Sequence, residues 1–406
     1  MKYFLSIALL GLAWAGRGQQ DSLVLSDSTK SDQVWLEAAA YIGAASRDIY
    51  VRDLLALTSG FLDQAEKDEL RAAVGDRFRL GYLQGWDISY RVFAPDDSLL
   101  KQPRWGLTLY NRSLLGIDAA AGALDLAIYG NAPFAGETVD FGDLRYQNWL
   151  YTGLRYQFAL KLGPKFLSQL GVALLIGHNH QGYGVDRGLL FTEVDGRYLD
   201  VEADYRIRES AAGGTYGIAG VGAALSWESR WQAWGGEWTA QLEDFGLMYW
   251  TRAQQNALDS NFRFSGIFIE DIFALRDSLL EAESEEIENS LLGTTSDSYL
   301  SLVPFRLSLA YQKRLSGRWL GRAELRYRYL PAYWPRFSAQ GLYQLNKQVW
   351  GAELAYGGFN QLTLGLLYRW RLNENWRLRA GVHNLFAAVP ALGQGLLLTG
   401  GLQYRL

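Results

Sequence analysis

Alternation of polar and apolar residues at every second position is the feature that most constrains this 406-residue chain. In 318–330 the even positions carry mostly arginine and glutamate, whereas the odd positions carry Trp319, Leu325, Tyr329 and small residues. The same split recurs in the segments 146–160, 198–207, 305–311, 361–371, 375–383 and 396–406. A period of two places alternate side chains on opposite faces of a β-strand. The chain is therefore expected to be all-β, with one charged and one apolar face on many strands.

The strands of a soluble β-sandwich alternate in the same way as those of a transmembrane β-barrel. Strand length and the placement of aromatic residues therefore have to distinguish these two folds. Aromatic residues gather towards strand ends, for example at Trp149 with Tyr151 and at Trp376. Transmembrane barrels place aromatic girdles there, and a tilted spanning strand needs ~9–11 residues, which is longer than a typical soluble strand. These features predict a single antiparallel transmembrane β-barrel of about 14 strands, within a range of roughly 12 to 16, with two short helical insertions.

The connections between the expected strands alternate in length. Tight turns at 316–317, 346–348 and 373–375 alternate with mostly longer connections, which is the arrangement of short periplasmic turns and longer outer loops. If the C-terminus is periplasmic, counting the strands back from it places the segment 271–298 on the outer side. Two segments lose the period of two and predict helical insertions at about 54–75 and 272–292. We expect these insertions to act as a plug or lid, or only to cover the barrel openings.

The first helical insertion has its helical part at 62–74, with Thr58 or Ser59 as cap candidates. The second is acidic and amphipathic, and its external position makes it a candidate docking loop for a protein partner.

The N-terminus has the pattern of a secretory signal peptide. Lys2 precedes an apolar run over 3–15, and small residues follow up to Gly18. We therefore predict a cleaved signal peptide over residues 1–18 and a barrel domain over 19–406, exported to the outer membrane of a Gram-negative cell. An N-terminal anchor is the alternative, but the run is too short to cross a hydrocarbon core of ~30 Å.

Composition excludes several functional classes. A formal net charge of −4 disfavours a nucleic-acid partner, and the absence of cysteine excludes disulfides, thiol catalysis and cysteine-bound zinc.

His178 and His180 are expected to form a polar pair near a turn, because no third metal ligand stands at a fixed spacing. Carboxylate groups such as Glu193 with Asp195, or Asp200, Glu202 and Asp204, are explained by the polar face of a strand in a solvated lumen. No enzymatic activity, metal or cofactor is expected.

Charged residues on the sequential strands near the C-terminus are candidates to face the lumen. They are Arg322, Glu324, Arg326, Arg328, Glu353, Arg369, Arg371, Arg377 and Arg379. Such a wall can select anions as they pass. It can equally pair with acidic residues to fill the interior of a closed barrel, and the sequence leaves both alternatives open.

The last strand resembles the C-terminal assembly signal of bacterial outer-membrane barrels, in Thr399, Gly401, Tyr404 and Leu406. The mature chain is similar to Bacteroidota outer-membrane barrels of an uncharacterised family, related to the long-chain fatty-acid transporter and the type IX secretion barrel. The segments 126–138 and 151–156 carry this resemblance. The Asn-Pro-Ala hatch motif of the fatty-acid transporters is not found, and no ligand-binding residue is carried over.

The resemblance implies outer-membrane lipid and the barrel-assembly machinery as partners. It also implies a channel or transporter for a small hydrophobic or amphipathic compound. The alternative is a non-transporting surface scaffold or secretion-system accessory. A secreted soluble protein that binds carbohydrate through its many tryptophans is a third hypothesis.

Overall fold

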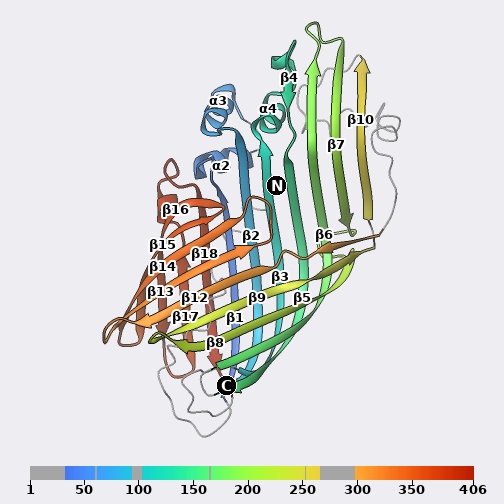
Figure 1. The fold of residues 1–406 in the computed structure, drawn as a ribbon. Coiled ribbons are helices and arrows are strands. Elements are labelled where there is room, and N and C mark those ends of the chain that lie inside the picture. Colours follow the sequence, from blue (N-terminus) through green and yellow to red (C-terminus); the bar gives the residue numbers. More distant parts are fainter. Residues whose placement is uncertain (1–32, 60–61, 94–102, 164–165, 252, 266–297) are drawn as a thin grey trace.

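The strands form one closed antiparallel β-barrel of fourteen strands, which confirms the fold class predicted from the alternation (Figure 1). The computed structural model describes residues 33–59, 62–93, 103–163, 166–251, 253–265 and 298–406. The barrel closes where β1 (Gln33–Ser46) pairs with β18 (Gly395–Arg405) on one side and with β2 (Arg77–Phe93) on the other. The two termini of the described barrel are therefore neighbours in the wall.

The remaining barrel strands follow one another around the wall. They are β3 (Pro103–Ala120), β5 (Leu144–Gly163), β6 (Phe166–Thr192), β8 (Gly220–Ala233), β9 (Gly236–Trp250), β12 (Arg306–Arg314), β13 (Trp319–Arg328), β14 (Trp334–Leu345), β15 (Gln348–Gly358), β16 (Asn360–Arg371) and β17 (Trp376–Val382). The short strand β11 (Tyr299–Leu302) pairs with the end of β9 and precedes β12 in the same part of the wall. The predicted tight turns are confirmed, since they join β12 to β13, β14 to β15 and β16 to β17.

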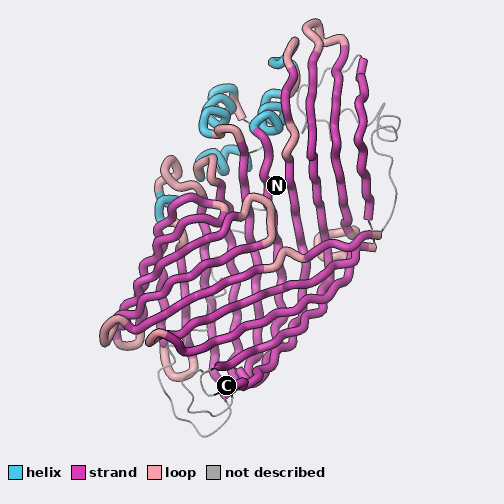
Figure 2. Tube along the Cα trace, viewed as in Figure 1, coloured by secondary structure: helices cyan, strands magenta, loops and turns pink. Residues whose placement is uncertain are grey.

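Part of the same sheet extends beyond the ends of β8 and β9 and is here called the extension sheet. It consists of residues 179–192 of β6 together with β4 (Thr138–Asp140), β7 (Tyr198–Ala211) and β10 (Ala253–Ser265). β6 can contribute to both the barrel wall and the extension sheet because it is 27 residues long: its first half pairs with β8 and its second half with β7. Figures 1 and 2 show the extension sheet projecting past the ends of the neighbouring strands.

Short helices lie at the same end of the barrel as the extension sheet (Figure 2). They are α2 (Val51–Ser59), α3 (Gln64–Ala73), α4 (Ala121–Tyr129) and the 3-10 helices η2 (Ala132–Phe134) and η4 (Leu385–Ala388). α2 and α3 occupy the first predicted insertion, but Asp63 caps α3 through a capping box with Glu66, and Thr58 and Ser59 belong to α2. The second insertion, at 272–292, lies outside the described residues.

Apolar packing holds the helices to the barrel. Ile49, Leu70, Phe78, Leu124 and Ile128 are buried together in one cluster between them. Within the described residues, no helix has both the length and the apolar character needed to cross a membrane.

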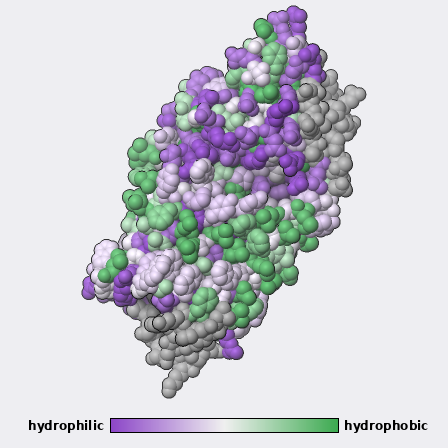
Figure 3. Space-filling view, in the orientation of Figure 1, coloured by the Kyte–Doolittle hydropathy of each residue, from purple (hydrophilic) through white to green (hydrophobic). Residues whose placement is uncertain are grey.

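The outer surface of the barrel carries an apolar band with aromatic side chains at both of its edges. At the edge with the tight turns, aromatic rings pair across strands, as in Trp319 with Tyr343 at 4.9 Å and Trp350 with Tyr368 at 4.5 Å between centroids. Leu325, Leu354 and Leu364 are exposed between the edges, and the opposite edge carries Trp334, Phe337 and Tyr356. Figure 3 shows hydrophobic surface over the barrel strands and mainly hydrophilic surface above them. This pattern is that of a transmembrane barrel.

Candidate functional site

A distorted point in the wall places an acidic residue inside the barrel. Between β8 and β9 the register shifts so that Glu243 and Asp244 together face the single residue Ser226, which is a β-bulge. Asp244 has a φ of 59°, in the left-handed region that non-glycine residues seldom adopt. Its side chain is buried. A strained residue of this kind persists only where its surroundings hold it in place, so its contacts are informative.

Side chains from strands that are not neighbours of β9 hold Asp244. The hydroxyl of Tyr110 on β3 donates to Asp244 Oδ1 at 2.8 Å, and that of Tyr151 on β5 donates to Oδ2 at 3.3 Å. Arg155, also on β5, forms an ion pair with the same carboxylate. Neither β3 nor β5 pairs with β9 in the sheet. These contacts therefore cross the interior instead of following the wall.

The contacts extend into a group that we call the cross-barrel cluster. It comprises Asp87, Tyr110, Arg112, Tyr151, Arg155, Glu243, Asp244 and Arg306. Arg112 pairs with Asp87 at 2.8 Å, and Glu243 pairs with Arg155 at 3.2 Å and with Arg306. Three carboxylates thus face three guanidinium groups, so the buried charges are balanced. Balance matters because an unpaired charge is very costly in a low-dielectric interior.

A glycine makes room for the cross-barrel cluster. Gly153 lies opposite Tyr110 in the register of β3 and β5. A Cβ atom at residue 153 would lie 2.3 Å from Cζ of Tyr110. The phenol ring can therefore lie flat over the wall only because no side chain stands at this position.

Ion pairs fill the interior on the β12 to β18 side as well. Glu353 on β15 accepts hydrogen bonds from Arg336 and from Gln340 Nε2, the latter at 2.7 Å, and its Oε1 lies 3.0 Å from Nδ1 of His383. On β1, Glu37 pairs with Arg91 at 3.1 Å and with Arg379. Each carboxylate meets at least two hydrogen-bond donors or basic side chains, which is the arrangement that offsets the cost of burial.

The charged residues singled out from the sequence fall into two groups. Arg322, Glu324, Arg328 and Glu353 are buried, whereas Arg326, Arg369, Arg371, Arg377 and Arg379 are half-buried. Glu324 lies between Arg326, at 2.6 Å, and Arg322, at 3.6 Å. Arg377 lies over the ring of Trp35, 4.2 Å from its centroid. These contacts pair the charged residues within the interior. A role of the same residues in selecting anions stays a prediction.

The C-terminal residues lie in or directly after β18. Thr399 lies 3.0 Å from Nε2 of His383, and Tyr404 packs on Trp376 at the edge of the apolar band. A Cβ on Gly401 would lie 2.6 Å from Nε of Arg379, so a side chain there would move the guanidinium of Arg379, which pairs with Glu37. The backbone N–H of Leu406 donates to the carbonyl of Val34. The reading of these four positions as an assembly signal stays a prediction.

A group of four ring-bearing side chains and one methionine, which we call the aromatic layer, lies against the cross-barrel cluster. It comprises Trp149, His180, Met248, Trp250 and Tyr299, all buried. The ring of His180 lies 4.3 Å from that of Trp149 and 5.3 Å from that of Trp250, between centroids. Nδ1 of His180 is hydrogen-bonded to the hydroxyl of Tyr299 at 2.7 Å. Trp149 also contacts Tyr151, so an apolar layer and an ionic layer adjoin inside one barrel.

The wall is interrupted beside the aromatic layer. β6 pairs with β8 up to Gly177 and with β7 from Asn179, and the residues 212–219 between β7 and β8 leave the ladder. His178 lies at this point and bridges Thr152 and the carbonyl of Gly217, each at 2.9 Å. The expectation of a histidine pair near a turn is therefore wrong, since both histidines lie within β6. Within the described part of the chain, no cluster of residues has the composition of a metal site.

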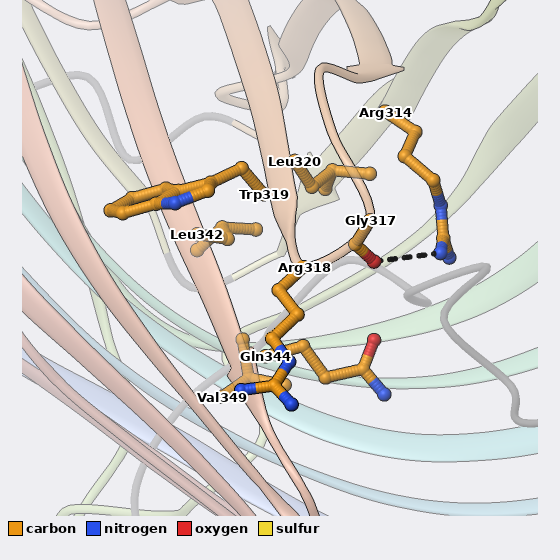
Figure 4. A pocket seen from close by; sticks show the side chains of 8 residues that line it. All are labelled: Arg314, Gly317, Arg318, Trp319, Leu320, Leu342, Gln344 and Val349. Atoms are coloured by element: carbon orange, nitrogen blue, oxygen red, sulfur yellow. Dashed lines mark hydrogen bonds between the residues drawn. The ribbon is translucent and has the colours of Figure 1, made fainter.

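Two hollows of the described structure differ greatly in size. One, near the tight turn between β12 and β13, has a volume of about 10 Å³ beside Trp319, Leu342 and Val349 (Figure 4). It holds at most a water molecule. The other, of about 480 Å³, lies on the extension sheet and is lined by Leu189, Phe191, Asp200, Glu202 and Arg263 among others. The acidic residues 200, 202 and 204, expected on a luminal strand face, thus stand on the extension sheet instead.

Comparison with known proteins gives similar folds only. No protein-family model and no curated protein matches the chain. Among solved structures, it is similar to a TodX deltaS2S3 mutant monoaromatic hydrocarbon channel, at 9% identity over 97% of this chain and 98% of that one, with a TM-score of 0.46. It is also similar to the toluene transporter TbuX of Ralstonia pickettii, at 10% identity over 98% and 97% of the two chains, with a TM-score of 0.43.

A third similar structure is a FadL homologue from Pseudomonas aeruginosa, at 12% identity over 92% of this chain and 89% of that one, with a TM-score of 0.39. At these identities and scores, no property of the three proteins is carried over to this chain.

Proposed function

We propose that this chain is an outer-membrane channel or transporter for small apolar or amphipathic compounds. The aromatic layer is the observation that supports the proposal. Barrels that act as general pores enclose a polar, water-filled interior. Here buried aromatic rings lie next to balanced, buried charges, so the described interior offers an apolar surface beside a polar one. An apolar group would contact the aromatic layer while a polar group could meet the cross-barrel cluster, as in sites that bind small molecules.

The interrupted wall gives such a compound a place to reach the interior. The segment 212–219 carries exposed Tyr216 and Ile218, and it contacts His178 through the carbonyl of Gly217. An apolar molecule arriving at this surface would be separated from the aromatic layer by one segment outside the ladder, instead of by a paired strand. Ala212 and Ala219 at its ends still bond to β6, but residues 213–218 between them have no ladder hydrogen bonds. This middle part can therefore move at a lower cost than a strand in the wall.

The proposed location follows from the apolar band and from the sequence. A signal peptide at 1–18 would export the chain, and the barrel-assembly machinery would recognise the last strand through Thr399, Gly401, Tyr404 and Leu406. Outer-membrane lipid would then cover the band. A protein partner at the acidic insertion 272–292 is part of the same proposal. Fractionation of cells that produce the full chain, with N-terminal sequencing of the mature protein, tests the location and the cleavage.

Uptake into intact Gram-negative cells tests the transport function. Cells that produce the barrel are compared with cells that lack it, using N-phenyl-1-naphthylamine, which fluoresces after reaching an apolar phase, and nitrocefin, a hydrophilic substrate for a periplasmic β-lactamase. We expect faster uptake of the apolar probe and unchanged nitrocefin hydrolysis. Unchanged uptake of both probes would contradict transport, and faster nitrocefin hydrolysis would indicate a general pore instead.

The filled interior also favours a second candidate function, a surface scaffold that transports nothing. The extension sheet supports this alternative, because it offers a sheet that projects past the barrel wall for contact with another molecule. Cross-linking of intact cells followed by purification of the barrel would test it. Recovery of a defined partner, together with no uptake of either probe, would favour the scaffold.

A further inference from the structure

Arg47 is a buried arginine without a counterion, at the end of the barrel that carries the short helices. It directly follows β1 and is only 7% exposed. Its guanidinium makes no hydrogen bond or ion pair with any described residue, although a buried charge without a partner is costly. None of its three side-chain nitrogen atoms is among the fully buried atoms that lack a partner, so each keeps some access to solvent. An anion from outside the protein can therefore reach this charge.

Two aromatic rings at the edge of the apolar band hold the guanidinium. Its Cζ atom lies 4.6 Å from the ring centroid of Trp334 and 5.7 Å from that of Tyr356, which is within the range of a cation–π contact. Both rings are more than half exposed, and Tyr356 lies opposite Phe337 in the register of β14 and β15. Ala355, the neighbour of Tyr356 in β15, is buried, so the ring of Tyr356 is on the outer face of the wall. Arg47 therefore presents its charge at the aromatic edge of the band.

Hydrogen bonds from two other segments fix the backbone of Arg47. Nε2 of Gln361 on β16 donates to its carbonyl oxygen at 3.1 Å, and Nε2 of Gln394, just before β18, donates to the same oxygen at 2.9 Å. The backbone is thus held by side chains and the guanidinium by rings. Little conformational freedom remains to be lost when an anion binds, which favours binding.

The acidic residues closest to Arg47 in the sequence are paired with other arginines. Asp48 accepts hydrogen bonds from Nε and Nη2 of Arg79, at 3.1 and 2.6 Å. Asp53 pairs with Arg52 at 3.2 Å. Neither carboxylate neutralises Arg47, so its counterion has to come from another molecule.

Exposed apolar side chains stand on the loop that adjoins Arg47, between β17 and β18. Val389 is 50% exposed and Leu392 is 63% exposed. The backbone N–H of Val51 donates to the carbonyl of Gly393 at 2.7 Å, which ties this loop to the segment that follows Arg47. A cation between exposed aromatic and aliphatic side chains suits a molecule that joins an anionic group to apolar chains.

We infer that Arg47 binds the phosphate group of an anionic lipid in the outer leaflet. A guanidinium can contact two phosphate oxygens while it stacks on an aromatic ring. The acyl chains of the same lipid would lie on the apolar band, since aromatic girdles stand at the level of the headgroups. The inference goes beyond transport and rests only on the proposed location in the outer membrane.

Native mass spectrometry of the full-length barrel, released from detergent micelles, tests this site. The barrel is titrated with dioleoyl phosphatidic acid and with dioleoylglycerol, which has the same chains and no phosphate. We expect tighter binding of phosphatidic acid. Arg47→Gln should weaken that binding about tenfold and leave dioleoylglycerol unchanged.

Arg52→Gln is the matched control. Arg52 lies near Arg47 in the chain, but its side chain is 41% exposed and already pairs with Asp53 and Glu69. It should bind both lipids as the parent protein does. Arg47→Lys keeps the charge without the planar group, so we expect a smaller loss than in Arg47→Gln. Heat-modifiable gel migration shows whether each variant folds, and Arg47→Lys tests the site if Arg47→Gln does not.

The outcomes separate the site from the location. Equal binding of the two lipids, or unchanged phosphatidic acid binding in both Arg47 variants, would overturn the site. An equal loss in Arg52→Gln would do the same, because it would indicate a general effect of charge. Displacement of phosphatidic acid by an equal concentration of inorganic phosphate would show a site for the free anion and overturn the lipid. Fractionation of cells tests the location independently, so a barrel found in the outer membrane without the lipid preference would contradict the site alone.

Discussion

The hydroxyl of Tyr110 on β3 donates a hydrogen bond of 2.8 Å to Asp244 on β9, which joins residues 134 positions apart across the barrel interior. Asp244 lies in a bulge with a left-handed backbone, so the bond holds a strained point of the wall. Barrel strands are otherwise held mainly by their neighbours. This bond and that of Tyr151 therefore tie together parts of the wall that are not neighbours in the sheet.

Tyr110→Phe is expected to lower the free energy of unfolding by about 1.5–3 kcal/mol, because it removes a hydrogen bond to a buried charge. Urea unfolding from detergent micelles, followed by tryptophan fluorescence, measures the change. Tyr41→Phe is the matched control, since the hydroxyl of Tyr41 is buried without a hydrogen-bond partner among the described residues. Its removal should be neutral or stabilising. Equal losses in the two variants would contradict the role given to the bond with Asp244.

Gly153→Ala tests the space that the Tyr110 ring needs. The added methyl group would lie 2.3 Å from Cζ of Tyr110, so the ring or the wall has to move. Overpacking of this kind costs about 1–3 kcal/mol, and we expect a smaller folded fraction by heat-modifiable gel migration. Gly341→Ala is the control, because a Cβ at residue 341 would have a single described atom within 4 Å, a ring carbon of Trp319 at 3.9 Å. A normal folded fraction in Gly153→Ala would contradict this packing.

The barrel was predictable from the sequence because alternation is a local property of each strand. Positions such as Leu325 and Leu354 face outwards and Glu324 and Glu353 are buried, in agreement with the charged and apolar faces. The tight turns were visible in their residue types, and the helix at 64–73 in its 3.6-residue pattern. α4 was missed because Ala121–Tyr129 is apolar on most sides and begins without a side-chain cap, so it lacked both helix signals.

The contacts across the interior could not be predicted in this way. Which residues of β3 and β5 meet β9 depends on the tilt and stagger of the strands, and these are properties of the closed barrel. The change of partner along β6 has the same origin. Its 27 consecutive strand residues give no sign of where pairing with β8 ends and pairing with β7 begins. His178 and His180 were therefore assigned to the vicinity of a turn.

Glu353→Gln tests whether the charged interior is structural. Glu353 holds Arg336 and Gln340 and lies beside His383, and it is 2% exposed. Removing one partner of a buried ion pair leaves the other charge uncompensated, so we expect a loss of about 3 kcal/mol in unfolding free energy. Arg371→Gln, at a half-buried position, should change it by less than about 0.5 kcal/mol. Similar small effects in both would favour a solvated, selective wall over a packed interior.

A final prediction concerns acid and the extension sheet. Asp200 on β7 accepts hydrogen bonds of 2.6 and 2.8 Å from Nε and Nη2 of Arg263 on β10, and these lower the pKa of Asp200 from its usual value of 3.8. The stabilisation is thus present above that value and is lost as the pH falls through the lower, folded pKa. Hydrogen exchange of β7, corrected for intrinsic rates, should show weaker protection below about pH 4. Asp200→Asn should remove this part of the pH dependence, whereas Arg197→Gln should keep it. Protection that is unchanged down to pH 2 would show that the pair does not hold β7 to β10.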